Sequence, residues 1–207
     1  RHDVQLGRAA PLLARAGHVG YVNLNLIVDE RGDERIETSY RYDGGLSEFT
    51  DFLAPDPAVT DTWRLQGEGR FTETVPVLQP SGAMVPTEVE RTCIVDVALR
   101  WGTGYDPRVS SFVNIIATPK GGTHLAGFEQ ALLKVFRKQL ADNARKLKVG
   151  GDKAEKEDVL AGLTAVVTVR LAEPQFEGQT KEVLGTSAVR AIVSKVVDSA
   201  LTERLSS

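Results

Sequence analysis

The sequence has almost none of the residues that build metal sites and disulfide bonds. Its 207 residues include one cysteine, Cys93, and three histidines, His2, His18 and His124, which are far apart in the chain. A lone cysteine excludes a disulfide within the chain and is typical of the reducing cytoplasm. The scattered histidines provide no set of ligands with metal-site spacing. We therefore expect a cytoplasmic protein without a metal site of its own.

Long apolar segments are also absent. The longest apolar runs, such as residues 165–167, are far shorter than the roughly 20 residues that a membrane-spanning helix needs. No basic and then apolar leader opens the sequence, so we expect neither export nor a membrane partner. Hydrophobic residues make up 42% and charged residues 26%, which is typical of a globular protein.

Lysine is missing from the first half of the chain, which makes the charge distribution uneven. Residues 1–103 contain ten arginines and sixteen acids, whereas residues 104–207 contain fifteen basic residues and twelve acids. The excess is largest over residues 134–156, with eight basic residues against three acids. Such a surface is usually a solvated face, but it can also meet the phosphates of DNA. The candidates for DNA contact are Lys134, Arg137, Lys138, Arg145 and Lys146.

Alternating apolar residues predict strands in the first part of the chain. Residues 22–28 and 35–42 flank a polar turn and predict a hairpin, whereas residues 1–20 have no clear period. A short helix is expected over residues 46–53 and a loop over residues 55–68. Three further strands are expected over residues 71–78, 88–101 and 111–118.

The second part of the chain predicts mainly helices. Gly121 and Gly122 indicate a tight turn, and Thr123 stands where a helix N-cap hydroxyl belongs. The helix that follows has an apolar strip formed by Phe128, Leu132, Val135, Phe136 and Leu140. A short helix, a strand, a polar loop and a long C-terminal helix are expected over residues 157–163, 164–171, 173–181 and 186–205. This order predicts an α+β fold with a mostly antiparallel sheet and helices on one face.

Few segments carry recognisable chemistry. The sequence has no GxxxxGK[ST] phosphate loop and no GxGxxG after a strand. The turn before Thr123 could bind an anion, but a simple turn is the commoner role. Glu88 and Glu90 share one face of a strand with no histidine nearby, which argues against catalysis, and a helix-start hydrogen bond is the favoured role of His124. The polar loop that ends at Gln179, Thr180 and Lys181 is different, because an amide, a hydroxyl and an ammonium group can neutralise a phosphoryl group.

Two motifs resemble a known family. Residues 111–128, SFVNIIATPKGGTHLAGF, are similar to the strand–turn–helix signature of the gyrase B and topoisomerase IV B subunits. Residues 174–181, PQFEGQTK, resemble the Gln-Thr-Lys loop of the same family, and residues 89–101 and 157–163 are similar too. The resemblance covers residues 22–205. It implies that residues 21–207 are a transducer domain, the second domain of the GHKL ATPases, with a fold related to GHMP kinases and certain ribosomal proteins.

The resemblance also implies a mechanism. Lys181 would contact the γ-phosphate of ATP held by a preceding module, Gln179 would assist, and Gly178 and Thr180 would belong to the same phosphate loop. ATP and Mg²⁺ would bind the full-length subunit, where hydrolysis drives DNA strand passage. The expected partners are a second B subunit, the DNA-cleaving A subunit and duplex DNA, with the basic helix over residues 134–148 lining the path of the DNA.

The sequence departs from the family pattern in what it lacks. Nothing in it matches the Mg²⁺-binding asparagine, the general-base glutamate or the glycine-rich lid of the ATP-binding module. We therefore expect this chain alone to be an inactive monomer that does not bind ATP tightly. Asn114 is not followed by a second asparagine, and with residues 87–106 this favours an actinobacterial-like topoisomerase IV B subunit over gyrase. A GHMP-type small-molecule kinase and a nucleic-acid-binding module are the alternatives.

Overall fold

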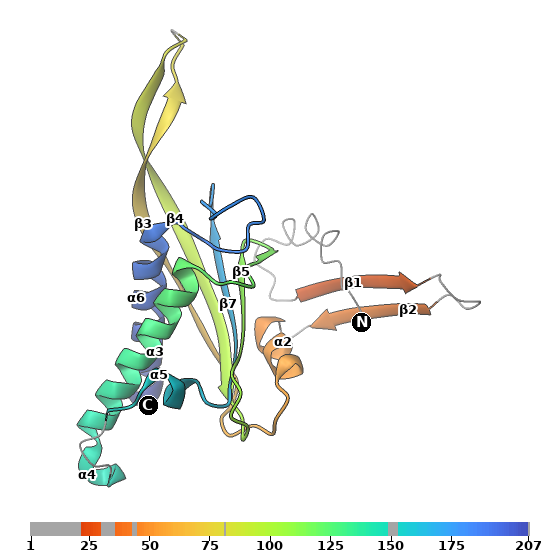
Figure 1. The fold of residues 1–207 in the computed structure, drawn as a ribbon, viewed down its shortest axis with the longest axis vertical. Coiled ribbons are helices and arrows are strands. Elements are labelled where there is room, and N and C mark those ends of the chain that lie inside the picture. Colours follow the sequence, from red (N-terminus) through yellow and green to blue (C-terminus); the bar gives the residue numbers. More distant parts are fainter. Residues whose placement is uncertain (1–21, 30–35, 43–44, 81, 149–152, 207) are drawn as a thin grey trace.

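A computed structural model describes residues 22–29, 36–42, 45–80, 82–148 and 153–206 (Figure 1). The prediction for residues 1–20 lies outside this part. The described elements are β1 (Val22–Asp29), β2 (Ile36–Tyr42), α2 (Gly45–Leu53), β3 (Trp63–Leu78), β4 (Met84–Trp101), β5 (Arg108–Val113), β6 (Ile116–Ala117), α3 (Thr123–Asp142), α4 (Ala144–Leu147), α5 (Lys156–Leu160), β7 (Leu163–Leu171) and α6 (Ser187–Ser206). The predicted hairpin of β1 and β2 is present as an antiparallel pair.

Five strands form the main sheet in the order β3-β4-β7-β5-β6. The pairs β3–β4, β4–β7 and β5–β6 are antiparallel, whereas β5 and β7 run parallel. A parallel pair needs a long crossover, and here the chain makes it through α3, α4 and α5. The predicted α+β class with a mostly antiparallel sheet is confirmed, and the parallel pair makes the sheet a mixed one.

The strand β3 begins within the segment that the sequence predicts as a loop. That prediction is wrong from Trp63 onward, because Gly67 and Gly69 break the apolar alternation. A Cβ on Gly67 would lie 2.9 Å from Val196, and one on Gly69 would lie 2.6 Å from Ile192. The two glycines therefore let α6 lie directly on the sheet, which is a packing requirement that strand propensity does not reveal.

The predicted strand over residues 111–118 is likewise interrupted. Asn114 has a φ of 57° and separates β5 from β6. Its amide nitrogen donates to the Val169 carbonyl oxygen (2.7 Å), and its side-chain oxygen accepts from the Leu171 amide (3.1 Å). Asparagine tolerates this left-handed conformation, so the residue ends one strand and ties it to the end of β7.

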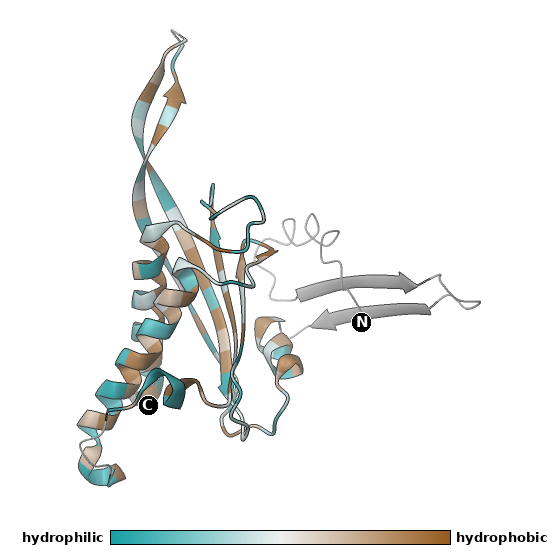
Figure 2. Cartoon of the chain, viewed as in Figure 1, coloured by the Kyte–Doolittle hydropathy of each residue, from teal (hydrophilic) through white to brown (hydrophobic). Residues whose placement is uncertain are grey.

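The two long helices, α3 and α6, pack side by side on one face of the sheet (Figure 1). Apolar and polar residues alternate in colour along α3, α6 and the strands of the main sheet (Figure 2). The buried apolar residues of these elements form one core. The core beneath the helices includes the fully buried Val95, Val97, Leu99, Phe128 and Val193. None of the helices in the described part is long and apolar enough to cross a membrane.

The opposite face of the sheet carries a smaller cluster. Leu46, on α2, packs there with Ala98 and Val166, which alternate along their strands with residues of the main core. The sheet is thus covered on both faces near Ala98 and Val166. At the other end the β3–β4 hairpin projects past β7, whose pairing with β4 stops at Cys93 (Figure 1).

Candidate functional site

The loop between β7 and α6 contains the residues that the sequence singles out for phosphate contact. Its base is closed by two backbone hydrogen bonds, from the Glu177 amide to the Val183 carbonyl oxygen (2.9 Å) and from the Gly185 amide to the Gln175 carbonyl oxygen (2.7 Å). The Gln175 amide also donates to the Thr186 hydroxyl (3.0 Å), directly before α6. The loop is therefore a defined projection with a fixed base.

The four predicted residues form the tip of this loop. Gly178, Gln179, Thr180 and Lys181 are all exposed. Gly178 has a φ of 78°, which glycine adopts without strain, and no atom lies within 4 Å of the place a Cβ would take. Among the described residues, the Lys181 ammonium group has neither a hydrogen bond nor an ion pair. The amine is thus free to meet a ligand from outside this domain.

The residues on either side of Lys181 are held in place. The Glu182 carboxylate forms an ion pair with the Lys120 ammonium group (2.6 Å) and accepts a hydrogen bond from the Thr180 hydroxyl (3.1 Å). These hydrogen bonds lower the pKa of Glu182 below its ordinary value, and the bond from Lys120 has the larger effect. Lys181 itself has a φ of 55°, which is uncommon for a residue with a side chain.

The turn before α3 forms the support of the loop. The Leu184 amide donates to the Gly121 carbonyl oxygen (3.1 Å), and the Thr123 amide donates to the Leu184 carbonyl oxygen (2.9 Å). The prediction that Thr123 is the N-cap is wrong, because Gly122 holds that position and has no side chain to cap the helix. The Thr123 hydroxyl instead donates to the Thr186 carbonyl oxygen (2.9 Å), and this bond joins the starts of α3 and α6.

His124 lies directly below this turn and is fully buried. Its Nε2 atom is 3.1 Å from the Thr118 hydroxyl oxygen, which is 2.8 Å from the Ser111 hydroxyl oxygen. Its Nδ1 atom has no hydrogen-bond partner among the described residues. Loss of solvent disfavours the charged imidazolium and lowers the pKa of His124 to about 4. His124 is therefore a neutral part of the core beneath the loop, and the one hydrogen bond of its ring among the described residues is with Thr118.

This burial predicts a pH-dependent stability. The unfolded chain takes up the His124 proton near pH 6.5, whereas the folded chain does so only near pH 4, so stability falls as the pH falls through this window. The free energy of unfolding should lose about 3 kcal/mol between pH 7 and pH 4 from this group. Urea denaturation of wild type and His124→Gln at several pH values measures it. Equal losses in both proteins would contradict the prediction.

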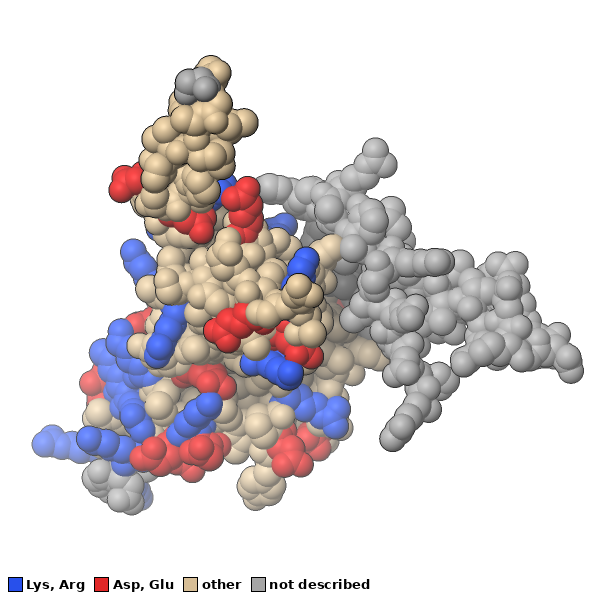
Figure 3. Space-filling view, turned by 45° about the horizontal axis from the view of Figure 1, so that its top comes forward, with Lys and Arg blue, Asp and Glu red and all other residues tan. Residues whose placement is uncertain are grey.

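The predicted DNA-facing residues do not form one free surface. Basic side chains gather on the helical side of the molecule, at the lower left of Figure 3. Lys134 pairs with Asp198, Lys138 pairs with Asp142 (2.6 Å), and Arg137 donates to the Ala154 carbonyl oxygen (2.7 Å). The other two candidates, Arg145 and Lys146 on α4, have neither an ion pair nor a side-chain hydrogen bond in the described part of the chain.

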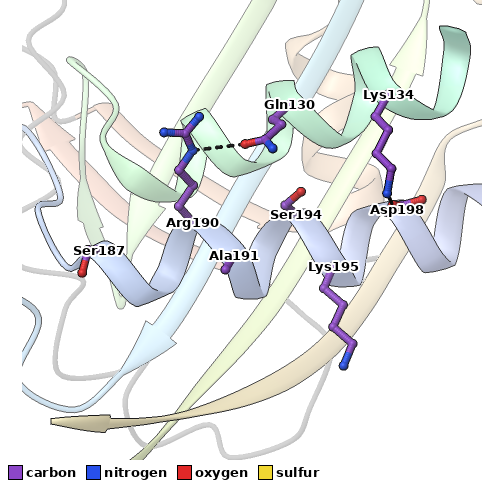
Figure 4. A pocket seen from close by; sticks show the side chains of 8 residues that line it. All are labelled: Gln130, Lys134, Ser187, Arg190, Ala191, Ser194, Lys195 and Asp198. Atoms are coloured by element: carbon purple, nitrogen blue, oxygen red, sulfur yellow. Dashed lines mark hydrogen bonds and ion pairs between the residues drawn. The ribbon is translucent and has the colours of Figure 1, made fainter.

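A shallow groove of about 590 Å³ lies between α3 and α6 (Figure 4). Lys134 on α3 and Arg190 on α6 each point toward the other helix, whereas Lys195 on α6 lines the edge of the groove and points away from α3. The Arg190 guanidinium group donates to the Gln130 side-chain oxygen (3.1 Å). The sequence did not single out these two α6 residues, although both lie among the polar residues of that amphipathic helix. The groove adds positive charge beside Lys134.

In the described part of the chain, neither the Glu88 and Glu90 carboxylates nor His124 forms a second site. Glu90 pairs with Arg70 (3.0 Å) on the projecting hairpin, where both are exposed. Glu88 is exposed on the same hairpin. No group of three or more metal-binding side chains occurs among the residues that the structure describes.

The fold matches part of the ATPase region of type IIA topoisomerase B subunits. The 43K ATPase domain of Thermus thermophilus gyrase B, solved with an aminocoumarin, superposes with a TM-score of 0.59 and 26% identity, over 83% of this chain and 41% of that one. The topoisomerase IV ATP-binding domain of Francisella tularensis shares the fold, with a TM-score of 0.58 and 23% identity over 83% of this chain and 40% of that one.

The chain belongs to the DNA gyrase B family, whose model matches residues 45–207. The gyrase B subunit of Treponema pallidum is 37% identical over 198 residues, which are 92% of this chain and 28% of that protein. The gyrase B subunit of Streptomyces coelicolor is 37% identical over 187 residues, 86% of this chain and 24% of that protein. The chain thus spans about a quarter of the length of these relatives.

Proposed function

We propose that residues 21–207 are the transducer domain of the parent B subunit, which senses the γ-phosphate of ATP through Lys181 and couples ATP hydrolysis to DNA strand passage. The observation that carries this proposal is the exposed ammonium group of Lys181, which has no ion-pair partner in the described part of the chain and lies at the tip of a loop whose base is fixed. Lys153 is also exposed without an ion pair in the described part of the chain, so what sets Lys181 apart is its place beside Gln179 and Thr180 at the tip of the loop. This group of an ammonium, an amide and a hydroxyl fits a phosphate that is presented by another module.

The chemistry of phosphoryl transfer supports this role. The reaction needs positioning and neutralisation of the phosphate charge more than covalent chemistry. Lys181 supplies the charge and Gln179 supplies an amide that can donate a hydrogen bond, while Thr180 and Gly178 form the exposed tip between and beside them. ATP and Mg²⁺ would be bound by the preceding module of the full-length subunit, so this chain alone is expected to be inactive.

The attachment of the loop supports the coupling. The loop is hydrogen-bonded to the turn before α3 on one side and to Thr186, directly before α6, on the other. Loss of the terminal phosphate would release the tip, and the loop could then shift both helices against the neighbouring module. The basic groove between α3 and α6, with Arg145 and Lys146, would face duplex DNA. The proposed assembly contains a second B subunit and the A subunit, in the cytoplasm. Topoisomerase IV rather than gyrase stays a prediction.

Lysine footprinting of the parent subunit tests the proposed contact. Lys181 should be acetylated severalfold more slowly in the presence of a non-hydrolysable ATP analogue than with ADP, because only the analogue has a terminal phosphate to shield the amine. Mass spectrometry measures the rate at each lysine. Lys153 is the internal control, since it is also exposed and should react equally with both nucleotides. Equal protection of Lys181 by ADP would refute sensing of the γ-phosphate.

A further inference from the structure

The outgoing limb of the loop, residues 182–184, lies against the turn that starts α3. Leu184 is fully buried and forms one β-bridge with Phe176, on the incoming limb, and a second with Gly122. The bonds from the Leu184 amide and to its carbonyl oxygen, described above, place the limb in register with residues 121–123. The position of the tip therefore depends on how closely this limb approaches the turn.

Gly122 sets that approach. A Cβ at this position would lie 2.4 Å from the Leu184 nitrogen and 2.5 Å from the Leu184 carbonyl oxygen. Both atoms belong to the backbone, so no side-chain rotation can relieve the contact. The φ of Gly122 is 135°, which residues with a side chain rarely adopt. Any larger residue must displace the outgoing limb.

Lys120 holds the limb at a second point, next to Lys181. Its ammonium group pairs with the Glu182 carboxylate (2.6 Å), and its amide donates to the Glu182 carbonyl oxygen (3.3 Å). The same carboxylate accepts from Thr180, so the residues before and after Lys181 are linked through one acceptor. Lys181, whose backbone is left-handed, lies between these two linked residues.

We infer that Gly122 and Lys120 are positioning residues for Lys181, which together fix the place of its ammonium group relative to the start of α3. The inference rests on the proposed function, because it assigns these residues to the same phosphate contact. Gly122 sets the height of the loop above the helix, and the Lys120–Glu182 pair sets the direction of the tip. Because both act through α3, movement of Lys181 is transmitted to that helix through backbone contacts.

Charge reversal in the parent subunit tests the pair. Lys120→Glu and Glu182→Lys should each lower kcat for ATP by about two- to fivefold, the range of an exposed ion pair, with little change in KM. The double reversal restores the attraction and should return kcat to within about twofold of wild type. Single variants with wild-type kcat, or a double variant no better than either single one, would overturn the role of the pair.

Glycine replacement tests the close approach. Gly122→Ala should lower kcat by about 100-fold, because a displacement near 1 Å is enough to misplace a catalytic group. Gly82→Ala in the β3–β4 turn is the matched control, since Gly82 also has a positive φ, of 83°, but has no atom within 4 Å of the added Cβ. Melting temperatures show whether each variant is folded. Equal kcat in the two alanine variants would refute the special role of Gly122.

The Lys181→Ala background separates positioning from structure. If Lys120 acts through Lys181, adding Lys120→Glu to Lys181→Ala causes no further loss of kcat, whereas a purely structural effect persists in that background. A wild-type kcat in Lys181→Ala would instead refute the proposed function itself. Loss in Lys181→Ala together with additive effects of Lys120→Glu would refute only the positioning role.

Discussion

Replacement of Lys181 by methionine in the parent B subunit is expected to lower the rate of ATP hydrolysis by about 10²–10³-fold, the usual loss when one preorganised charge or hydrogen-bond donor is removed from a transition state. Methionine keeps an unbranched side chain of similar length but removes the ammonium group, and the exposed site leaves room for it. The loss should therefore arise from charge and not from packing. A steady-state ATPase assay with and without DNA measures it.

The same variant should lose ATP-driven strand passage but keep part of the nucleotide-independent DNA relaxation or cleavage, because those reactions need no γ-phosphate contact. Lys153→Met is the matched control, since Lys153 is an exposed lysine outside the loop and has no ion pair among the described residues. Its ATPase rate should equal that of wild type. A Lys181→Met subunit with unchanged ATPase would exclude the role assigned to Lys181.

The sequence predicts those elements best that have one buried and one exposed side. The C-terminal helix α6 has regular apolar spacing, so its type and approximate bounds are correct, whereas the predicted basic helix over residues 134–148 is interrupted at Asn143, between α3 and α4. The start of β3 was missed because Gly67 and Gly69 are selected by contact with Ile192 and Val196, which are more than a hundred residues away in the chain. A strand whose residues are determined by contact with a distant helix cannot be recognised from the local pattern of apolar residues.

The candidate loop could be predicted, but its support could not. Gln179 and Lys181 are only two residues apart within one short motif, so a resemblance is enough to find them. Lys120 and Glu182 are 62 residues apart and meet only when the start of α3 lies beside the loop. For the same reason the Thr123 hydroxyl was assigned to its own helix, although it bonds to Thr186, 63 residues further on. Sequence patterns predict hydrogen bonds between neighbouring residues, whereas the bonds that support this loop join residues that are far apart in the chain.

Replacement of Phe128 by alanine is expected to have the largest effect on stability. The side chain is fully buried on α3 within the main core, and truncation of a buried phenylalanine costs about 3–5 kcal/mol. This is a large fraction of the roughly 5–15 kcal/mol that stabilises a typical domain. Urea denaturation of the 207-residue chain measures the loss as a lower midpoint at constant slope.

Next to Phe128, α3 lies so close to α6 that the helix has little room to shift. At the neighbouring Gly127 a Cβ would lie 2.4 Å from the Arg190 carbonyl oxygen, so α3 and α6 are already in close backbone contact there. Because the two helices are already in contact, they cannot move closer to fill a cavity at Phe128, so little collapse offsets the loss. Tyr105→Ala, at a tyrosine that is 85% exposed, should change the stability by less than about 0.5 kcal/mol. A Phe128→Ala variant as stable as Tyr105→Ala would show that α3 is not held against the sheet, and Lys181 would then have no rigid helix to act on.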